Sequence, residues 1–197
     1  MSDDETLKVY AEKAQEYADM VAAPDQPNSH LVAFVSALPH GGTVLDLGCG
    51  PGNSAGAMAR AGLMVTATDP VPEMVALAAQ HDGVDARVAS FDDITGTDLY
   101  DGIWANFSLL HASRADMPRH LAALAQALKP GGQFHIGMKT GTGSKRDSIG
   151  RLYTYYTDAE LTGLLGAVGL TVTDRTTGRE KGLDGVEAPW ICLAAHG

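Results

Sequence analysis

Residues 44–54 read Val-Leu-Asp-Leu-Gly-Cys-Gly-Pro-Gly-Asn-Ser. An apolar strand pattern runs directly into a turn with glycine at every second position, Gly48, Gly50 and Gly52, and a helical pattern follows. Glycine allows the backbone to turn sharply, and because it has no Cβ it lets a ligand approach the main chain. The stretch therefore predicts a nucleotide-binding turn, with a purely structural tight turn as the alternative.

Two residues of this stretch favour one nucleotide over another. Asn53 stands where the dinucleotide-binding fingerprint G-x-G-x-x-G has its last glycine. Asp46 precedes the first glycine by two residues and is expected at the mouth of the strand. A carboxylate there would repel a pyrophosphate, but it would attract a ligand that carries an ammonium and a sulfonium, as S-adenosylmethionine does. The charge pattern therefore points to S-adenosylmethionine rather than NAD.

Two more carboxylates follow the next two predicted strands. Asp69 ends the second strand, where an acid can accept both ribose hydroxyls; the alternative is a helix N-cap ahead of Pro72. Asp92 follows the third strand, where it can take the adenine amino group while Phe91 packs beside the ring; the alternative is an inert loop aspartate. No lysine or arginine for phosphate binding lies near the turn, so the predicted cradle is anionic.

The pattern around the turn predicts an α/β fold. Short apolar runs at residues 44–47, 64–68, 86–89, 102–105 and 133–138 alternate with helical patterns, as in βαβ units. The runs at 170–173 and 189–195, joined by a connection with Gly178, Gly182 and Gly185, are too close for a helical crossover and should pair antiparallel. We expect a Rossmann-like, doubly wound sheet of about seven strands, mostly parallel with the last strand reversed, and helices on both faces.

Helix signals divide the chain further. A pattern from Leu7 to Val21 ends at Pro24 and Pro27, and a second helix begins near Asn28. Capping boxes at residues 113–116 and 157–160 open two later helices. We expect one domain over residues 1–197, with an N-terminal helical cap at 1–42, a donor-binding core at 43–139, and an acceptor-side loop, helix and terminal strand pair at 140–197.

Composition restricts the partners. The formal net charge is -10 and no basic cluster offsets it, so nucleic acid is a poor partner and a cationic or neutral small molecule fits better. No run approaches the roughly 18–20 apolar residues of a membrane span, and the first ten residues are acidic, so we expect a cytoplasmic protein without a membrane partner. The two cysteines, Cys49 and Cys192, are expected to be buried free thiols, and no metal site is predicted.

Taken together, these motifs resemble class I, Rossmann-like methyltransferases over residues 30–140. In that resemblance residues 46–52 match the first motif, Asp69 the ribose acid and residues 91–92 the adenine edge. Residues 101–106 look like the fourth strand, which flanks the methyl donor, and residues 128–132 like the turn before the fifth. A narrower likeness, at residues 105–111, 150–156 and 189–190, is to small bacterial methyltransferases near the tellurite-resistance type. It implies a small-molecule acceptor and S-adenosylhomocysteine as product.

The predicted site has a donor half and an acceptor half. The donor half comprises Tyr17, Asp46, Gly48, Cys49, Gly50, Gly52, Asp69, Pro70, Met74, Phe91, Asp92, Asn106 and Ser108. The acceptor half comprises His111, Arg151, Tyr153 and Tyr156, with Lys139 nearby. His111 is a candidate base or a packing residue, and Arg151 either orients an anionic substrate group or pairs with an acid.

The sequence leaves four further points open. Tyr10 and Tyr17 either cover the donor or form a plain core stripe, and residues 140–150 resemble a mobile lid. The competing functions are a dinucleotide-dependent oxidoreductase and a non-catalytic S-adenosylmethionine-binding module, the latter recognisable by an occluded acceptor space. The sequence does not indicate an oligomeric state.

Overall fold

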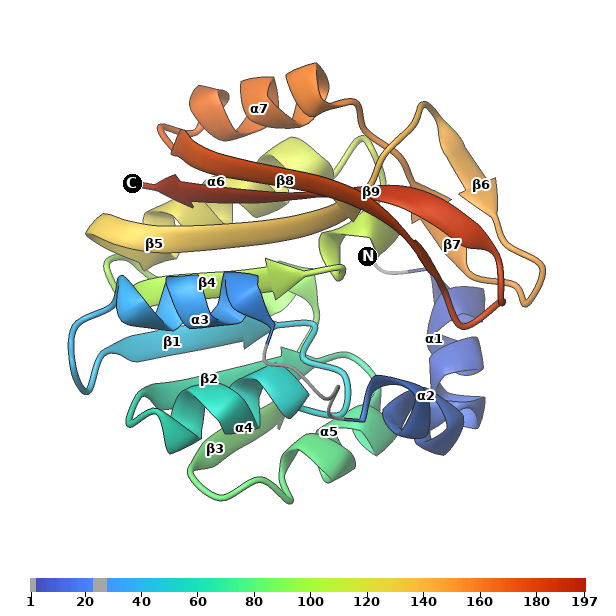
Figure 1. The fold of residues 1–197 in the computed structure, drawn as a ribbon, viewed down its shortest axis with the longest axis horizontal. Coiled ribbons are helices and arrows are strands. Elements are labelled where there is room, and N and C mark those ends of the chain that lie inside the picture. Colours follow the sequence, from blue (N-terminus) through green and yellow to red (C-terminus); the bar gives the residue numbers. More distant parts are fainter. Residues whose placement is uncertain (1–2, 23–27) are drawn as a thin grey trace.

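A computed structural model describes residues 3–22 and 28–197, and its centre is a seven-stranded sheet (Figure 1). The strand order is β3 (Val84–Val88), β2 (Met64–Asp69), β1 (Thr43–Leu47), β4 (Tyr100–Asn106), β5 (Leu128–Lys139), β9 (Glu187–His196) and β8 (Thr171–Lys181). Strands β1 to β5 pair in parallel, whereas β9 pairs antiparallel with both β5 and β8. The predicted fold class, with one reversed strand, is confirmed.

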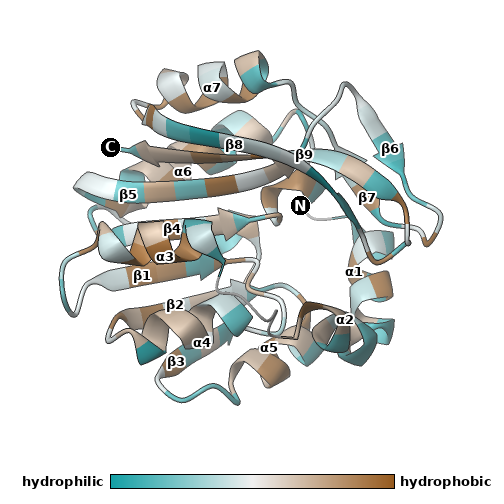
Figure 2. Ribbon diagram, viewed as in Figure 1, coloured by the Kyte–Doolittle hydropathy of each residue, from teal (hydrophilic) through white to brown (hydrophobic). Residues whose placement is uncertain are grey.

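Helices cover both faces of this sheet. On one face α3 (Ser29–Ser36) and α4 (Asn53–Arg60) bury Phe34 and Met58 against β1, β2 and β4. On the other, α6 (Met117–Ala127) and α7 (Asp158–Ala167) bury Met117, Leu121 and Leu161. In Figure 2 the hydrophobic colour follows α3 and parts of the central strands, whereas the outer strand β8 is mostly hydrophilic. The chain order reverses at β1, which lies between β2 and β4, and open α/β sheets bind ligands at that point.

The N-terminal cap differs from the prediction in one respect. The expected first helix is two helices, α1 (Asp4–Glu12) and α2 (Ala14–Val21), because Lys13 leaves helical geometry at φ -113° and ψ 19°. Pro24 and Pro27, where that pattern was expected to end, lie outside the described residues. Asn28 caps α3 as predicted, and its Oδ1 accepts hydrogen bonds from the backbone nitrogens of His30 and Leu31 at 3.0 and 3.3 Å.

Two segments near the C-terminus are more regular than expected. Within residues 140–150, interpreted above as a lid, β6 (Ser144–Arg146) pairs antiparallel with β7 (Leu152–Thr154). Gly178 was expected in a connection but lies inside β8, opposite Trp190. Glycine fits this position because a Cβ there would collide with the indole ring. The β8–β9 hairpin is therefore longer than predicted, and its tip reaches the cavity described below.

α5 (Pro72–Ala78) and two short 3₁₀ helices, η1 (Phe91–Asp93) and η2 (Leu109–His111), complete the element list. Among residues 3–22 and 28–197, no helix combines the length and the apolar character needed to cross a bilayer.

Candidate functional site

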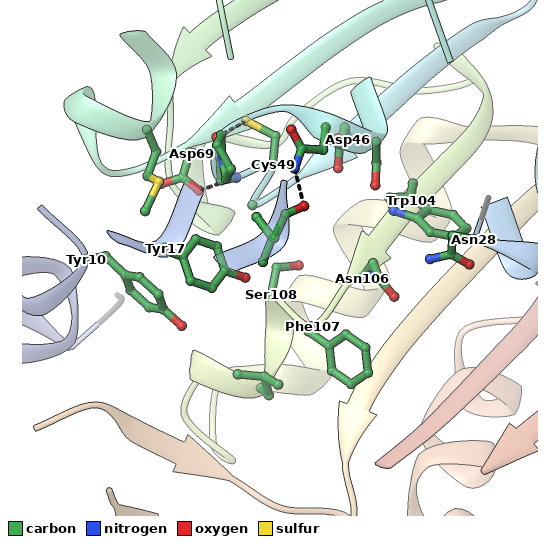
Figure 3. Close-up of a pocket in the computed structure, with 18 of the residues that line it drawn as sticks. Tyr10, Tyr17, Asn28, Asp46, Cys49, Asp69, Trp104, Asn106, Phe107 and Ser108 are labelled. Atoms are coloured by element: carbon green, nitrogen blue, oxygen red, sulfur yellow. Dashed lines mark hydrogen bonds between the residues drawn. The ribbon is translucent and has the colours of Figure 1, made fainter. Parts of the chain in front are cut away.

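A cavity of about 1290 Å³ opens at the carboxyl ends of β1, β2 and β4. Its walls come from α1, α2 and α3, from the glycine turn after β1, and from the tip of the β8–β9 hairpin. Figure 3 shows residues of this wall, with Asp46, Tyr17 and Ser108 arriving from three separate elements. Sites for one small molecule usually measure about 300–1,000 Å³. The cavity therefore has room for two small ligands side by side.

The glycine turn forms one wall as predicted. The backbone nitrogens of Gly48 and Cys49 donate to the Thr68 carbonyl at 2.7 and 2.9 Å, which fixes the turn against the end of β2. Gly50 has φ +53°, and a Cβ there would stand 3.5 Å from the Tyr17 ring. Glycine at this position therefore combines a left-handed backbone with an open approach from the cavity to the main chain.

Gly52 has a packing role in the structure. Its φ is +83°, and a Cβ on Gly52 would lie 2.7 Å from the Cα of Ala78, at the end of α5. The third glycine therefore lets α4 begin close to α5, and its contact with the donor stays a prediction.

Asp69 connects the glycine turn to α5. Its Oδ2 accepts a hydrogen bond from the backbone nitrogen of Gly50 at 3.0 Å, and its Oδ1 accepts one from Val71 at 2.9 Å. Burial raises the pKa of Asp69 to about 6, although both backbone hydrogen bonds act in the opposite direction. Each carboxylate oxygen has a second lone pair, so the backbone contacts leave acceptor capacity for ligand hydroxyls.

Asp46 is the most unusual charged group in the cavity. Its side chain is 3% exposed, and Oδ2 has no hydrogen-bond partner among the described residues. Burial raises the pKa of Asp46 to about 7, the charge of Asp69 adds to this, and the backbone nitrogen of Ala55 opposes it. A buried carboxylate is costly unless it is paired. This position therefore suits a cationic ligand.

Four other residues of the cavity wall have a buried polar atom without a described hydrogen-bond partner. These atoms are the Ser108 Oγ, the Trp104 Nε1, the Trp190 Nε1 and the Arg151 Nη2, the last of which lies at ion-pair distance from Asp147. Trp104 is the register partner of Asp46 across the β1–β4 pair, so the two side chains leave the sheet on the same face. The sequence prediction missed Trp104, because only the strand register shows that it stands beside Asp46.

Most of the predicted donor residues line the cavity. They are Tyr17, Asp46, Gly48, Cys49, Gly50, Asp69, Pro70, Met74, Phe91, Asn106 and Ser108. We call the part formed by Asp46, Gly50, Asp69, Met74 and Phe91 the donor end.

Asp92 is an exception among the predicted donor residues. It follows Phe91 in η1, but its carboxylate pairs with Arg119 of α6 at 2.6 Å and does not line the cavity. The Arg119 contact also lowers the pKa of Asp92. Asp92 therefore forms an ion pair between η1 and α6, and its contact with adenine stays a prediction.

In another part of the cavity wall, Tyr10, His111 and Arg151 form one hydrogen-bonded chain. The His111 Nδ1 lies 2.7 Å from the Leu152 carbonyl oxygen, which can only accept, so Nδ1 carries the proton. Nε2 consequently accepts from the Tyr10 hydroxyl at 3.0 Å, and the Tyr10 oxygen accepts from Nη1 of Arg151 at 3.0 Å. Burial lowers the pKa of His111 to about 4. His111 is thus a neutral ring with both nitrogens engaged.

Arg151 is paired as well. Its guanidinium reaches Asp147 with Nε at 2.9 Å and Nη2 at 2.8 Å from the same carboxylate oxygen, and both side chains are buried. The alternative of an ion pair with an acid is therefore realised, and Asp147 is a residue that the prediction missed. Lys139 and Tyr153 complete this end, with the Lys139 Nζ 4.0 Å above the centre of the Tyr153 ring. We call Tyr10, His111, Lys139, Arg151 and Tyr153 the acceptor end.

Tyr156 was expected beside Tyr153 but does not line the cavity. The two residues are three apart in extended chain, so their side chains leave on opposite sides. Tyr156 packs in the core with its ring under the guanidinium of Arg114, 4.3 Å away. Its predicted place among the acceptor residues is therefore corrected to a core position.

Comparison with known proteins finds similarity to methyltransferases. A family model described as a methyltransferase domain matches residues 44–132. The chain is 37% identical over 131 residues to a cypemycin N-terminal methyltransferase from a Streptomyces species, and this match covers 63% of this chain and 54% of the relative. It is 41% identical over 112 residues to a ubiquinone biosynthesis O-methyltransferase from Xanthomonas campestris pv. campestris, and this match covers 53% of this chain and 46% of the relative. The match thus spans about half the length of these curated relatives.

A solved structure is similar over nearly the whole chain. It is the Burkholderia thailandensis 1,6-didemethyltoxoflavin-N1-methyltransferase, with bound 1,6-didemethyltoxoflavin and S-adenosylhomocysteine. The TM-score is 0.78 at 23% identity, with 98% of this chain and 87% of that chain covered. At this identity the likeness establishes the shared fold.

Proposed function

We propose that this chain is an S-adenosylmethionine-dependent methyltransferase of the class I superfamily, and that it transfers the methyl group of S-adenosylmethionine to a small molecule. The observation that carries the proposal is Asp46, a buried carboxylate with an unpartnered oxygen at the end of β1. A ligand that brings an ammonium and a sulfonium supplies the positive charge this position lacks.

The rest of the donor end supports the same ligand. The Gly50 position leaves open the space that a Cβ would fill, and Asp69 keeps acceptor capacity for ribose hydroxyls beside it. Phe91 and Met74 offer apolar surface for a purine ring in the same wall. Bound there, S-adenosylmethionine supplies a methyl carbon already activated by a sulfonium leaving group. The protein's task is then to hold the acceptor about 3–3.5 Å from that carbon and in line with the breaking bond.

The two competing functions are less well supported. A dinucleotide would place its pyrophosphate against Asp46, whose negative charge already lacks a partner in the described structure. A non-catalytic module would have little acceptor space, whereas the cavity continues from the donor end to Tyr10, His111 and Arg151. A small molecule fits this enclosed space better than a folded protein or a nucleic-acid duplex.

The test is a transfer assay with a labelled methyl group. The purified chain is incubated with S-adenosylmethionine and a bacterial metabolite extract, and the products are separated by mass. We expect label in a compound of low molecular mass, with an equal amount of S-adenosylhomocysteine formed. The Asp69→Ala variant serves as a control in which labelling falls at low donor concentration. Label found only in protein or nucleic acid, or no label although the donor binds, would contradict the proposal.

A further inference from the structure

The acceptor end contains a lysine whose amine makes no ion pair with any described carboxylate. Lys139 is the last residue of β5 and lies in the cavity wall. Among the described residues, no carboxylate lies within ion-pair distance of its amine, which rests on the Tyr153 ring instead. Burial lowers the pKa of Lys139; Arg151 acts in the same direction, whereas Asp184, Asp147 and Glu180 oppose it. The ammonium is therefore in a place where an anion would stabilise it.

The neighbouring charges do not supply that anion. Asp147 is already bound to Arg151 through two guanidinium nitrogens. The charges of Asp184 and of Glu180, at the end of β8, also act on Lys139, but among the described residues neither carboxylate lies within ion-pair distance of its amine. The Lys139 amine therefore has carboxylates around it but no direct ion pair among the described residues, which leaves it available to a bound anion.

The acceptor end also lacks a side chain that is ready to accept a proton. Both nitrogens of His111 are engaged, and burial together with the charges of Arg151 and Lys139 lowers its pKa to about 4. Burial raises the pKa of Tyr10, which opposes its ionisation, and Asp147 is held in its ion pair. None of His111, Tyr10 and Asp147 is therefore free to take a proton from a nucleophile bound beside Lys139.

The shape of the acceptor end adds a second criterion. The Tyr153 ring lies under Lys139, and the rings of Phe107 and Trp190 meet edge to face at 6.3 Å in the same wall. Flat aromatic walls favour a flat ligand, because stacked and edge-to-face ring contacts add to the burial of apolar area.

We propose that the acceptor is a planar, conjugated molecule whose oxygen, sulfur or nitrogen nucleophile is already ionised when it binds, paired with Lys139. This rests on the proposed function. In the transfer step the electron pair of the anion forms the new bond to the methyl carbon. The bond from that carbon to sulfur breaks with its electrons moving to sulfur, so the sulfonium becomes a neutral thioether and the anion a neutral methylated product. No proton moves, and no base is required.

The probe for this proposal is 4-nitrophenol, which ionises near neutral pH and absorbs differently as phenol and phenolate. The chain is first saturated with S-adenosylhomocysteine, and this binding is measured on its own by calorimetry. A spectroscopic pH titration of bound 4-nitrophenol then reports its pKa on the protein. We expect phenolate to bind at least tenfold more tightly than phenol, which lowers the pKa of the bound probe by about one unit or more.

Three variants show whether Lys139 is responsible. Lys139→Met should remove the preference for phenolate and weaken its binding about tenfold to a hundredfold, the range of a hydrogen bond to a charged group. Lys139→Arg should restore most of the preference. Lys145→Met makes the same change on β6, at an exposed position outside the cavity, and should leave the preference unaltered.

The outcomes separate this inference from the proposed function. No binding of S-adenosylhomocysteine would overturn the proposed function itself. Three outcomes would overturn the anionic-acceptor proposal alone. The first is that S-adenosylhomocysteine binds but 4-nitrophenol does not. The others are an unchanged or raised pKa of the bound probe, and an equally lowered pKa in Lys139→Met.

Discussion

The two ends of the cavity are built in different ways. The donor end comes from the carboxyl ends of neighbouring parallel strands, with Asp46 near the end of β1 and Asp69 at the end of β2. The acceptor end joins residues far apart in the chain, because the Tyr10 hydroxyl meets His111 and Arg151 from 101 and 141 residues away. Local sequence determines the first end, and tertiary packing determines the second.

The electrostatics of the two ends are also opposite. The donor end has two buried carboxylates, Asp46 and Asp69, whose pKa values are raised to about 7 and about 6. The acceptor end has Lys139 without a carboxylate partner in the described structure, and beside it Arg151 held by Asp147. Such an arrangement suits a cationic donor at one end and an anionic acceptor at the other.

Arg151→Ala tests how strongly the acceptor end depends on its tertiary contacts. The change leaves Asp147 buried without its ion-pair partner and with backbone hydrogen bonds alone, and breaking a buried pair costs about 3–5 kcal/mol. We expect a loss of that size in the free energy of unfolding, measured by urea denaturation. Turnover should fall roughly a hundredfold, because the Tyr10 hydroxyl loses the hydrogen bond donated by Arg151. The affinity for S-adenosylmethionine should stay within about threefold of wild type. The double variant with Asp147→Asn should recover part of the stability, and an equal loss of donor affinity would show that the two ends are not separate.

Gly50→Val tests the donor end by filling it. The branched side chain enters the space in front of Tyr17, so donor affinity measured by calorimetry should fall about a hundredfold or more. Gly41→Val is the matched control, because Gly41 has a similar φ of +70° and its Cβ would meet nothing within 4 Å. The control should lose a comparable amount of stability and keep its donor affinity. Equal affinities in the two variants would remove Gly50 from the site.

Asp69→Ala and Asp92→Ala compare two acids that follow neighbouring strands. Asp69→Ala should weaken donor binding about tenfold to a hundredfold, as expected for lost hydrogen bonds to a charged group. Asp92→Ala should leave donor binding unchanged, because that carboxylate pairs with Arg119 outside the cavity. If titration calorimetry showed the reverse order, the ribose assignment would be wrong.

Asp46→Asn should change stability and donor binding in different ways, and both changes should be smaller than those expected for the variants above. The pKa of Asp46 is raised in the folded chain to about 7, so the folded state binds more protons than the unfolded state from about pH 4 to pH 7. Stability without ligand therefore falls as the pH rises through this range. At pH 8 the variant should be more stable than wild type by about 1–3 kcal/mol, measured by urea denaturation.

Donor affinity should show the opposite trend. Because a cationic donor favours ionised Asp46, the affinity of the wild type should increase about tenfold between pH 5.5 and 7.5. Asp46→Asn should lose this dependence. A pH dependence that persists in the variant would assign it to another group.

The difference between the two ends explains what the sequence could predict. Strand runs, the glycine turn, and the positions of Asp46 and Asp69 follow from local patterns, and the structure places them as expected. The role of Asp92 depends on a partner in α6, and that of Gly52 on the approach of α5, neither of which a local pattern contains. The side-chain alternation of extended chain would have separated Tyr153 from Tyr156.

The measurement that tests the central claim most directly is a comparison of S-adenosylhomocysteine with NAD by thermal denaturation, each at about 100 times the dissociation constant of S-adenosylhomocysteine. At that concentration a specific ligand adds about 2.7 kcal/mol of stability. For a chain of this size we expect the melting temperature to rise by about 5–10 °C with S-adenosylhomocysteine and to change little with NAD. An equal or larger rise with NAD would contradict the account.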